Sequence, residues 1–560
     1  MCLYAISTAL ACLEKQLGNV LDENNVFSYQ QIVACDEQED FPEAACQQLN
    51  AWGLSHYYVP AAWGGKLTGF DQLILLMKLV ARRDLTIAIA HGKTFLGASP
   101  IWVAGSDEQK RFVSRVISAH YPVALGLTEK AHGSDLLAND VIARVEAGQY
   151  RISGQKWLIN NATRGRLMTL LARTDECHGA RAHSLLLVDK HQLEQPAYRT
   201  LKKIKTHGIR GADISGIEFD DALVDSATLI GKAGQGLEIT LKSLQISRTL
   251  CCSLSLGALD SALRTTTKFA LNRVLYQTPI IEIAHVRETL AEAYAHLLVN
   301  EALAIVIARC LQAVPEQMSL YAAVAKYRVP KQTDRVIYEL SRILGARHYL
   351  REAHDSGVFQ KIMRDNLLVG LFDGSTVVNA QWIADQLPAV FRKLGTQIID
   401  PETCSQLFDL TSPLPAFRPE KLSLTCRGQD LLMNTIEGLF RQISQTSALY
   451  PPLLQLVQER DELQRLLQAG KISAERLSLD AEALIWRYTQ LIAGACVVNL
   501  IKHNASSPQF RTELLSVILA HLWGDSADPA YPDRVDFIIK QLVADYQSDK
   551  VFSVINWSIR

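Results

Sequence analysis

The sequence predicts an α+β fold with a helical N-terminal domain, a central β domain, a helical bundle and an extra C-terminal helical domain. Apolar residues recur at helical spacing up to residue 120 and again from residue 236, whereas short apolar runs and glycine turns fill the stretch between them. Strands and helices do not alternate along the chain, which argues against a doubly wound sheet. With 560 residues, 48% of them hydrophobic, the chain can bury large cores.

Residues 1–120 are expected to form the helical N-terminal domain. The apolar start, Met1 to Leu13, predicts an amphipathic core helix, because Glu14 follows it directly and no basic residue precedes it. A later helix has one apolar face, which consists of Leu73, Leu75, Leu76, Leu79 and Val80. Near the end of the domain, either Ser106 or Asp107 is expected to cap the next helix.

Residues 121–235 have the texture of a β domain. The runs Met168–Ala172 and Leu185–Val188 are separated by polar, glycine-containing turns, and Tyr150 and Ile152 flank a polar residue with period 2. We therefore expect a compact β domain of sandwich or barrel type.

Helical periodicity returns in residues 236–395, which we expect to form the bundle. Its first apolar stripe consists of Leu254, Leu256, Ala258, Leu259 and Leu263. Residues 396–425 contain four prolines and are interpreted as a linker. Residues 426–560 are again helical in pattern and form the C-terminal extension, whose role the sequence does not indicate.

Composition excludes several classes of protein. The formal net charge is −1, which argues against a general electrostatic grip on nucleic acid. No run reaches the roughly 18 uninterrupted apolar residues of a membrane span. The eleven cysteines form no CxxC pair and no Cys/His cluster with zinc-site spacing, so we expect free thiols, no metal site and a cytoplasmic protein.

The most informative short segment is Phe372 to Thr376, which places Asp373 in a glycine turn between apolar neighbours. A carboxylate there would be desolvated, and burial favours its protonated form, which would make it a usable base near neutral pH. Two upstream segments add weight to this motif: Leu127 to Asp135, with Glu129 and Gly133-Ser134, and Gly154 to Asn160.

In this order the three segments resemble the acyl-CoA dehydrogenase family of flavoproteins. The resemblance covers about residues 40–395, and the C-terminal extension is similar in length and helical pattern to that of very-long-chain members. It implies FAD as cofactor, an acyl thioester as substrate, either CoA or an acyl-carrier protein as its carrier, and an electron-transfer flavoprotein or oxygen as electron acceptor. It also implies a homo-dimer or homo-tetramer with no nucleic-acid partner and a role in fatty acid metabolism.

The resemblance assigns the first cofactor-binding residues to the predicted β domain. Thr128, next to Leu127, takes the place of the residue that meets flavin N5, and Gly133-Ser134 takes the place of the pair that serves flavin phosphate and substrate. Aligning the second segment on its lysine puts Leu158 where the family usually has Trp and Asn160 where it has Thr. Flavin shielding by an indole ring is then lost.

Further roles fall on the helical bundle. Arg273, with the aromatic Tyr276, matches the arginine that reaches the FAD pyrophosphate of a neighbouring subunit, and a guanidinium suits phosphate oxygens. Arg248 matches a substrate-side arginine. Gly345 remains from a glycine-rich turn near the adenosine half of FAD, although the glycines that would follow it are replaced.

Asp373 stands where most of the family has the catalytic Glu. By resemblance it takes the α proton of the thioester while the β hydrogen leaves as hydride to flavin N5, with Gly374 on the substrate side and Ser375 on the cofactor side. Aspartate is one methylene shorter, so its reach falls by about 1.5 Å. Three hypotheses remain open: an acyl thioester dehydrogenase, a nitroalkane-type or related flavin oxidase, and a non-catalytic assembly subunit. The acyl chain, the carrier, the acceptor and the oligomer size are not readable from the sequence.

Overall fold

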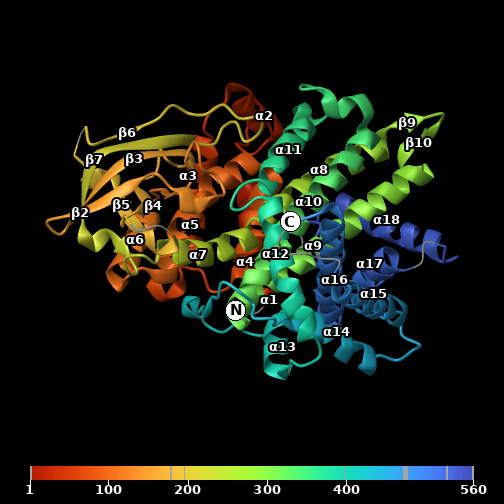
Figure 1. Cartoon of the computed structure of the whole chain (residues 1–560). Coiled ribbons are helices and arrows are strands. Elements are labelled where there is room, and N and C mark those ends of the chain that lie inside the picture. Colours follow the sequence, from red (N-terminus) through yellow and green to blue (C-terminus); the bar gives the residue numbers. More distant parts are fainter. Residues whose placement is uncertain are drawn as a thin grey trace.

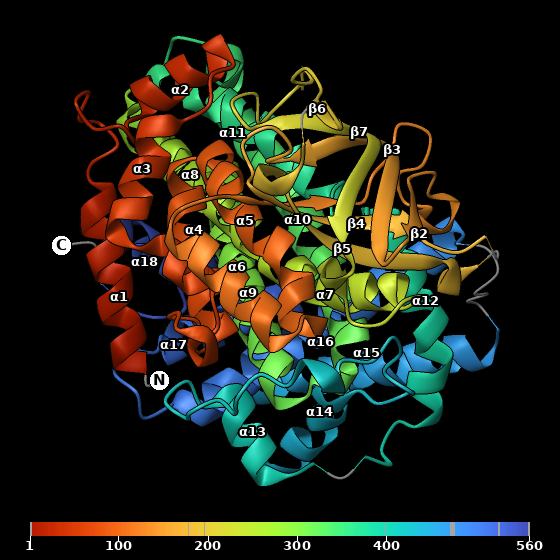
Figure 2. The same ribbon diagram turned by 90° about the vertical axis from the view of Figure 1, so that its left-hand side faces the viewer.

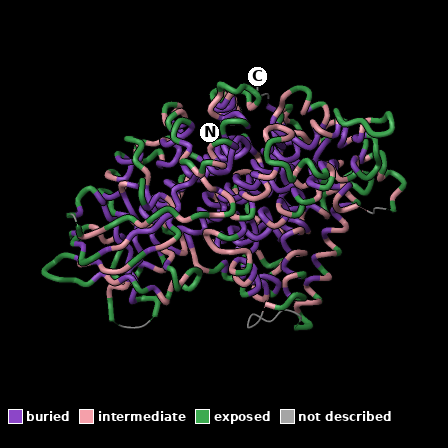
Figure 3. Tube along the Cα trace, turned by 90° about the horizontal axis from the view of Figure 1, so that it is seen from above, coloured by how far each residue is buried: buried purple, intermediate pink, exposed green. Residues whose placement is uncertain are grey.

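The computed structural model describes residues 3–176, 179–194, 196–397, 399–470, 477–524 and 527–557. The expected α+β architecture is confirmed. The β sheet and the C-terminal helices lie on opposite sides of the central helices (Figure 1). Buried segments run through the centre of the helical part (Figure 3). Cys2 and Cys177 lie outside the described residues, and the nine described cysteines are free thiols.

The N-terminal part is helical as expected. Ser106 caps α6 in a capping box with Gln109, which decides between the two predicted caps. The helices are α1 (Leu3–Leu17), α2 (Tyr29–Gln38), α3 (Glu43–Trp52), α4 (Phe70–Arg83), α5 (Leu85–Ala104) and α6 (Asp107–Ser118), with a short 3₁₀ helix η1 (Leu54–Tyr58) between α3 and α4. The predicted apolar face at Leu73–Val80 lies on α4, where it is buried.

The β domain is a single mixed sheet with the order β6-β7-β3-β2-β4-β5-β8, and β1 pairs with β4. No second, facing sheet is present in the described part of this domain, so the sandwich alternative is wrong. Strand β3, which is as long as β7, pairs with β2 on one side and with β7 on the other and so keeps these strands in one sheet. The strands are β1 (Val123–Gly126), β2 (Ile142–Glu146), β3 (Gln149–Asn160), β4 (Leu167–Arg173), β5 (His183–Asp189), β6 (Tyr198–Thr200), β7 (Ile214–Asp225) and β8 (Leu229–Ile230).

The bundle and the extension complete the chain. The bundle holds α7 (Gly236–Leu250), α8 (Cys252–Asn272), α9 (Ala284–Ala313), α10 (Met318–Leu344), α11 (Val358–Asn366) and α12 (Thr376–Arg392), with a hairpin of β9 (Val274–Leu275) and β10 (Thr278–Pro279). The C-terminal helices are α14 (Leu431–Gln442), α15 (Tyr450–Gln468), α16 (Leu479–Asn504), α17 (Thr512–Trp523) and α18 (Tyr531–Gln547). Within 396–425, α13 (Pro401–Phe408) buries Leu407 and Phe408.

Two separate hydrophobic cores hold these layers. The sheet has its own core, which includes Ile152 and Leu170, whereas one continuous core joins the N-terminal helices, the bundle and the extension. The helices α9 and α16 are long and apolar enough to cross a membrane, but 89% and 83% of their most apolar windows are buried inside the protein. Burial of this extent is typical of core helices, and α9 and α16 pack directly against each other.

The β domain is joined to the bundle and also to the N-terminal helices. On the bundle side, the backbone N–H of Ile209 donates to Asp365 of α11 at 2.7 Å, and Arg364 donates to the carbonyl of His207 at 2.9 Å. On the side of the N-terminal helices, Thr169 of β4 donates to the carbonyl of Gly97 in α5 at 2.8 Å, where an added Cβ would lie 2.4 Å from a β1 carbonyl oxygen. Figure 2 shows the sheet beside α5 and α11.

A buried charge network ties the C-terminal segment to α4 and to the bundle. Lys78 of α4 donates to Glu301 of α9 at 2.7 Å and to the carbonyl of Phe552 at 2.6 Å. The backbone N–H of Val554 donates to the second oxygen of Glu301 at 2.6 Å, and that of Phe552 donates to Asp260 of α8 at 3.0 Å. The C-terminal segment therefore supplies backbone partners to charges that would otherwise be buried without them.

We predict that Lys78→Met lowers the free energy of unfolding by about 3–5 kcal/mol, because it leaves a buried carboxylate uncompensated. The matched control is Lys242→Met, which breaks the partly exposed Lys242–Glu238 pair and should cost less than about 1 kcal/mol. Urea unfolding followed by circular dichroism measures both. Equal losses in the two variants would show that the network does not support the fold.

Candidate active site

The turn that carries Asp373 follows the 3₁₀ helix η11 (Leu367–Gly370) and leads into α12. Asp373 and Gly374 both have left-handed backbones, with φ of 55° and 96°. Two side chains hold the turn: Arg248 of α7 donates from Nε to the carbonyl of Asp373 at 2.9 Å, and Asn379 of α12 donates to the carbonyl of Gly374 at 2.9 Å. A non-glycine residue in this conformation is strained, so the surrounding contacts must over-determine it.

The carboxylate of Asp373 has a cation beside it. The ammonium of Lys93, on α5, lies 2.9 Å from Asp373 Oδ2, and the two side chains are only 8% and 7% exposed. The thiol of Cys251 donates to the same oxygen at 3.4 Å. Burial raises the pKa of Cys251 to about 12, so this thiol stays protonated as a donor. Both contacts stabilise the ionised form of the carboxylate.

This arrangement corrects one expectation from the sequence. A carboxylate between apolar walls was expected to be governed by desolvation, but Lys93 and Arg248 surround Asp373 with positive charge. Burial lowers the pKa of Arg248 to about 10, which leaves the guanidinium charged at neutral pH. The opposing effect of nearby cations was missed because Lys93 lies 280 residues away in the sequence.

Phe372 separates two ammonium groups. Its ring centroid lies 3.6 Å from Lys93 Nζ and 4.9 Å from Lys326 Nζ, both within cation–π range. Lys326, on α10, also donates to the carbonyl of Val369 in η11, and burial lowers its pKa. The ring and the ammonium groups fix the residues on either side of Asp373.

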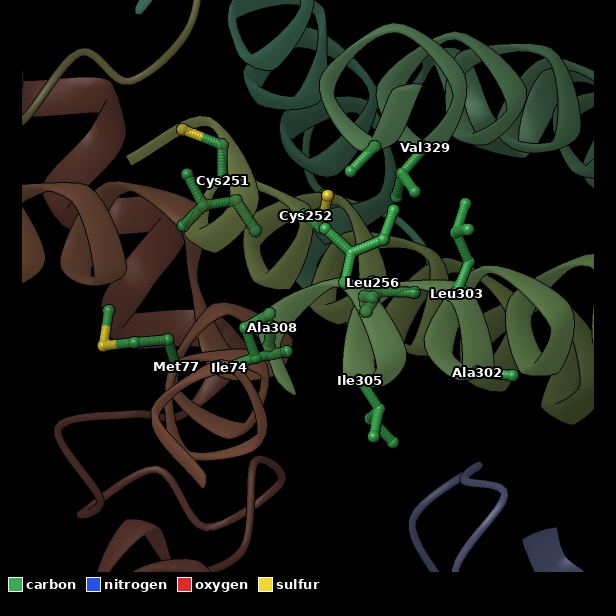
Figure 4. Packing of buried hydrophobic residues seen from close by; sticks show 14 of the residues in the cluster. Ile74, Met77, Cys251, Cys252, Leu256, Ala302, Leu303, Ile305, Ala308 and Val329 are labelled. Carbon is green, nitrogen blue, oxygen red and sulfur yellow. The ribbon is translucent and has the colours of Figure 1, made fainter. Parts of the chain in front are cut away.

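Asp373 is one of the residues that line a mostly apolar cavity of about 60 Å³. The cavity is lined by side chains from η1, α4, α5 and the junction of α7 and α8, including Tyr58, Met77, Lys93, Leu250, Cys251 and Leu254. Met77 and Cys251 belong to the same packed cluster in Figure 4. The site therefore places a carboxylate beside a space that fits a small apolar group, an arrangement suited to removing a proton from carbon.

Leu127 and Thr128, two of the predicted cofactor residues of the β domain, lie against β3. The carbonyl of Thr128 accepts from the backbone N–H of Trp157 at 2.9 Å, and Lys156 donates to the carbonyl of Leu127 at 3.0 Å. Leu158 is 38% exposed at a bulge in β3, where its φ is 56°. The bulge turns this apolar side chain outward beside the half-buried Thr128.

The remaining residues of this group are more exposed or already partnered. Gly133 and Ser134 are exposed in the loop after β1, and an added Cβ at Gly133 would meet no atom within 4 Å. Asn160 ends β3 and is partly buried. Ser375 caps α12 by accepting from the backbone N–H of Val378 at 3.3 Å.

Three predicted residues lie at a different end of the molecule. Arg273 and Tyr276 belong to the β9–β10 hairpin, which lies far from the sheet in Figure 1, and Tyr276 is fully exposed. Arg347, two residues after Gly345, stacks at 5.3 Å on Phe269, one helical turn before Arg273. Gly345 and Arg273 thus lie at one end of the bundle. They do not lie near Thr128 or Asp373 of the same chain.

The sequence reasoning missed Lys93, Cys251 and Tyr58. A signal for Lys93 existed, since it is the one Lys, Arg, Asp or Glu in the 20-residue helix α5. A lone ammonium on a buried apolar helix requires a partner, and a carboxylate is the natural one. Nothing in the pattern identified which carboxylate.

Three family models match the chain: the N-terminal domain of acyl-CoA dehydrogenase at residues 27–119, the middle domain at 124–222 and the C-terminal domain at 234–387. Among curated proteins, the chain is 28% identical over 345 residues to cyclohex-1-ene-1-carbonyl-CoA dehydrogenase from Geobacter metallireducens, which covers 61% of this chain and 89% of that protein. It is 25% identical to human mitochondrial short-chain specific acyl-CoA dehydrogenase, over 64% of this chain and 85% of that protein.

Solved structures share the fold. Butyryl-CoA dehydrogenase from Megasphaera elsdenii superimposes with a TM-score of 0.63 at 22% identity, over 68% of this chain and 98% of its own. An acyl-CoA dehydrogenase complexed with FAD from Bacillus anthracis gives a TM-score of 0.72 at 17% identity, over 97% of this chain and 90% of its own. The second similarity extends through the C-terminal helices.

The held turn at Asp373 generates a test of its geometry. Gly374→Ala places a Cβ 2.7 Å from Arg248 Nη2 on a backbone with φ of 96°, and we expect a loss of about 1–3 kcal/mol in unfolding free energy. Gly395→Ala is the control, because its φ is 78° but no atom lies within 4 Å of the added Cβ. Urea titrations compare the variants, and a smaller loss at Gly374 would contradict the close packing of Arg248.

Proposed function

The chain belongs to the acyl-CoA dehydrogenase family and is a flavin oxidoreductase, and from that premise we propose that it oxidises an acyl thioester to the α,β-unsaturated product with Asp373 as the base. The observation that carries the proposal is the position of the Asp373 carboxylate. It borders an apolar cavity, and one of its oxygens accepts hydrogen bonds from Lys93 and Cys251. Arg248 donates to the backbone carbonyl of the same residue.

The residues of this chain fit FAD, the cofactor of the family. An isoalloxazine ring needs an apolar ledge with a few hydrogen-bond donors. Leu158 offers an outward apolar side chain, Thr128 an adjacent hydroxyl, and Gly133-Ser134 an open loop with room for close approach. We assign these residues, with Leu127 and Asn160, to the flavin side and Ser375 to the cofactor side of the base. When bound, FAD supplies the hydride acceptor.

The chain's own residues divide the remaining work. Asp373 accepts the α proton, and Lys93 and Arg248 act as positioning residues that keep the carboxylate ionised and its turn fixed. Among the described residues, none accepts a hydrogen bond from the backbone N–H of Asp373 or Gly374. We propose that one of these amides polarises the thioester carbonyl, in the manner of an oxyanion hole. The apolar lining excludes water from the α carbon.

The carrier and the electron acceptor follow only by analogy. We propose CoA or an acyl-carrier protein as carrier, and an electron-transfer flavoprotein or oxygen as acceptor. Two solved structures of similar fold are the electron transferring flavoprotein of Acidaminococcus fermentans and the prolyl acyl carrier protein oxidase AnaB. We place the protein in fatty acid metabolism and in the cytoplasm.

The distant hairpin supports a homo-dimer or homo-tetramer. Val274, Leu275 and Tyr276 expose apolar surface there, and Arg273 adjoins them. A cofactor site that needs Arg273, Tyr276 and Gly345 would therefore be completed by a second copy of the chain.

A second candidate function is a flavin oxidase. Asp373 in place of Glu and Leu158 in place of the expected Trp favour this alternative, whose substrate would be a carbon acid such as a nitroalkane. Release of hydrogen peroxide without an added acceptor would favour this alternative over the dehydrogenase.

We predict that Asp373→Asn lowers kcat/KM by about 10²–10⁴, the usual contribution of a positioned general base. Anaerobic titration of the purified yellow protein with a panel of acyl-CoA and acyl-carrier thioesters measures the loss as the rate of flavin bleaching. An Asn variant that bleaches at the wild-type rate, or a wild-type protein that binds no flavin, would refute the assignment. A biological readout untouched by Asp373→Asn would indicate the non-catalytic alternative.

We predict that Lys93→Met lowers the free energy of unfolding by about 3–5 kcal/mol, because it leaves the buried carboxylate of Asp373 without its cation. Lys93→Arg keeps the positive charge and should lose less. Urea unfolding followed by circular dichroism compares the variants. Equal stability of wild type and Lys93→Met would remove Lys93 from the role of counter-ion.

A further inference from the structure

Helix α5 separates two cavities. One face of the helix, with Ala88, Ile89, Gly92 and Lys93, lines the apolar cavity beside Asp373. The opposite face, with Ala90, His91 and Thr94, lines a second cavity of about 310 Å³. This second cavity is more polar and extends to Glu43 and Arg164, which are partly exposed on the surface.

Among the described residues that line the two cavities, Tyr58 is common to both. Its side chain is 1% exposed, and burial raises its pKa well above the usual value, so the phenol stays protonated. The hydroxyl lies 2.6 Å from His91 Nδ1, and His91 Nε2 lies 2.9 Å from Asn50 Oδ1. Burial lowers the pKa of His91 to about 3, so the imidazole is neutral and links the two polar groups.

The apolar cavity is small. One water molecule requires roughly 10–15 Å³ on the same measure of volume. The cavity of about 60 Å³ therefore holds about four to six water-sized groups. Tyr58 lines it next to Met77, whose sulfur lies 3.6 Å from the phenol oxygen. Tyr58 also lines the second cavity, which has about five times that volume.

We propose that Tyr58 is the specificity-determining residue that limits the acyl group to a short chain, by separating the acyl cavity from the second cavity. The proposal rests on the proposed function, since it places the acyl group in the cavity beside Asp373. An ordinary core tyrosine would have packed side chains on both sides of its ring. Tyr58 instead lines both cavities, and its hydroxyl is held by His91 of α5, the helix that lies between them.

The test uses two opposite changes in the lining of the cavity. Tyr58→Ala removes the ring and joins the cavities, so binding should gain about fourfold for each methylene beyond the wild-type limit, the value of burying one CH₂. Gly92→Ala adds a Cβ that would lie 2.7 Å from Met77 Cε and 3.9 Å from the Tyr58 hydroxyl, so it should shorten the accepted chain. The methionine end is flexible, so this variant is expected to fold. Tyr58→Phe keeps the ring and should keep the wild-type limit.

Two readouts separate this proposal from the function on which it rests. Isothermal titration of each holoenzyme with saturated acyl-CoA thioesters of four to eight carbons measures the length limit, and anaerobic flavin bleaching measures oxidation. A limit that lengthens in Tyr58→Ala and shortens in Gly92→Ala supports the proposal, whether or not the thioester is oxidised. A limit unchanged in Gly92→Ala and in Tyr58→Ala overturns it even where wild type oxidises short thioesters. Absence of any thioester binding by wild type overturns both.

Discussion

The ion pair between Lys93 and Asp373 is the interaction on which the site depends. A carboxylate beside an apolar cavity is costly unless a cation and hydrogen-bond donors accompany it. Here the ammonium belongs to Lys93 on α5, and the donor thiol belongs to Cys251 at the junction of α7 and α8. The guanidinium of Arg248 on α7 holds the backbone carbonyl of Asp373. These helices come from two parts of the chain, and they must keep their relative positions for Asp373 to keep its partners.

Buried, paired charges also hold the surrounding helices in their relative positions. The helix α4 packs extensively on α8 and also contacts α5, and its Lys78 joins α9 and the C-terminal segment through buried charges. Because the last described residues donate to Glu301 and Asp260, the extension is part of the scaffold that positions the helices around Asp373. A continuous core through the N-terminal helices, the bundle and the extension is consistent with this coupling.

Local patterns along the chain were sufficient to predict the order of the helical and β parts, a cap at Ser106 or Asp107 and the turn at Asp373, because these depend on neighbours within a few residues. Long-range pairing was not accessible. Lys93 and Asp373 are 280 residues apart, and the two faces of α5 look alike in sequence although one lines each cavity. The strand order of the sheet was inaccessible for a related reason, since the pattern of β3 and β7 does not record which strands they pair with.

The position of Lys93 also bears on the proposed chemistry of Asp373. If Asp373 takes a proton from the substrate, its negative charge is lost, and Lys93 loses its anionic partner within the same buried site. In the proposed reaction the ammonium would then favour negative charge on the substrate at the moment when it develops. One cation would thus serve the resting carboxylate and the transition state in turn, which the apolar lining of the cavity could not do.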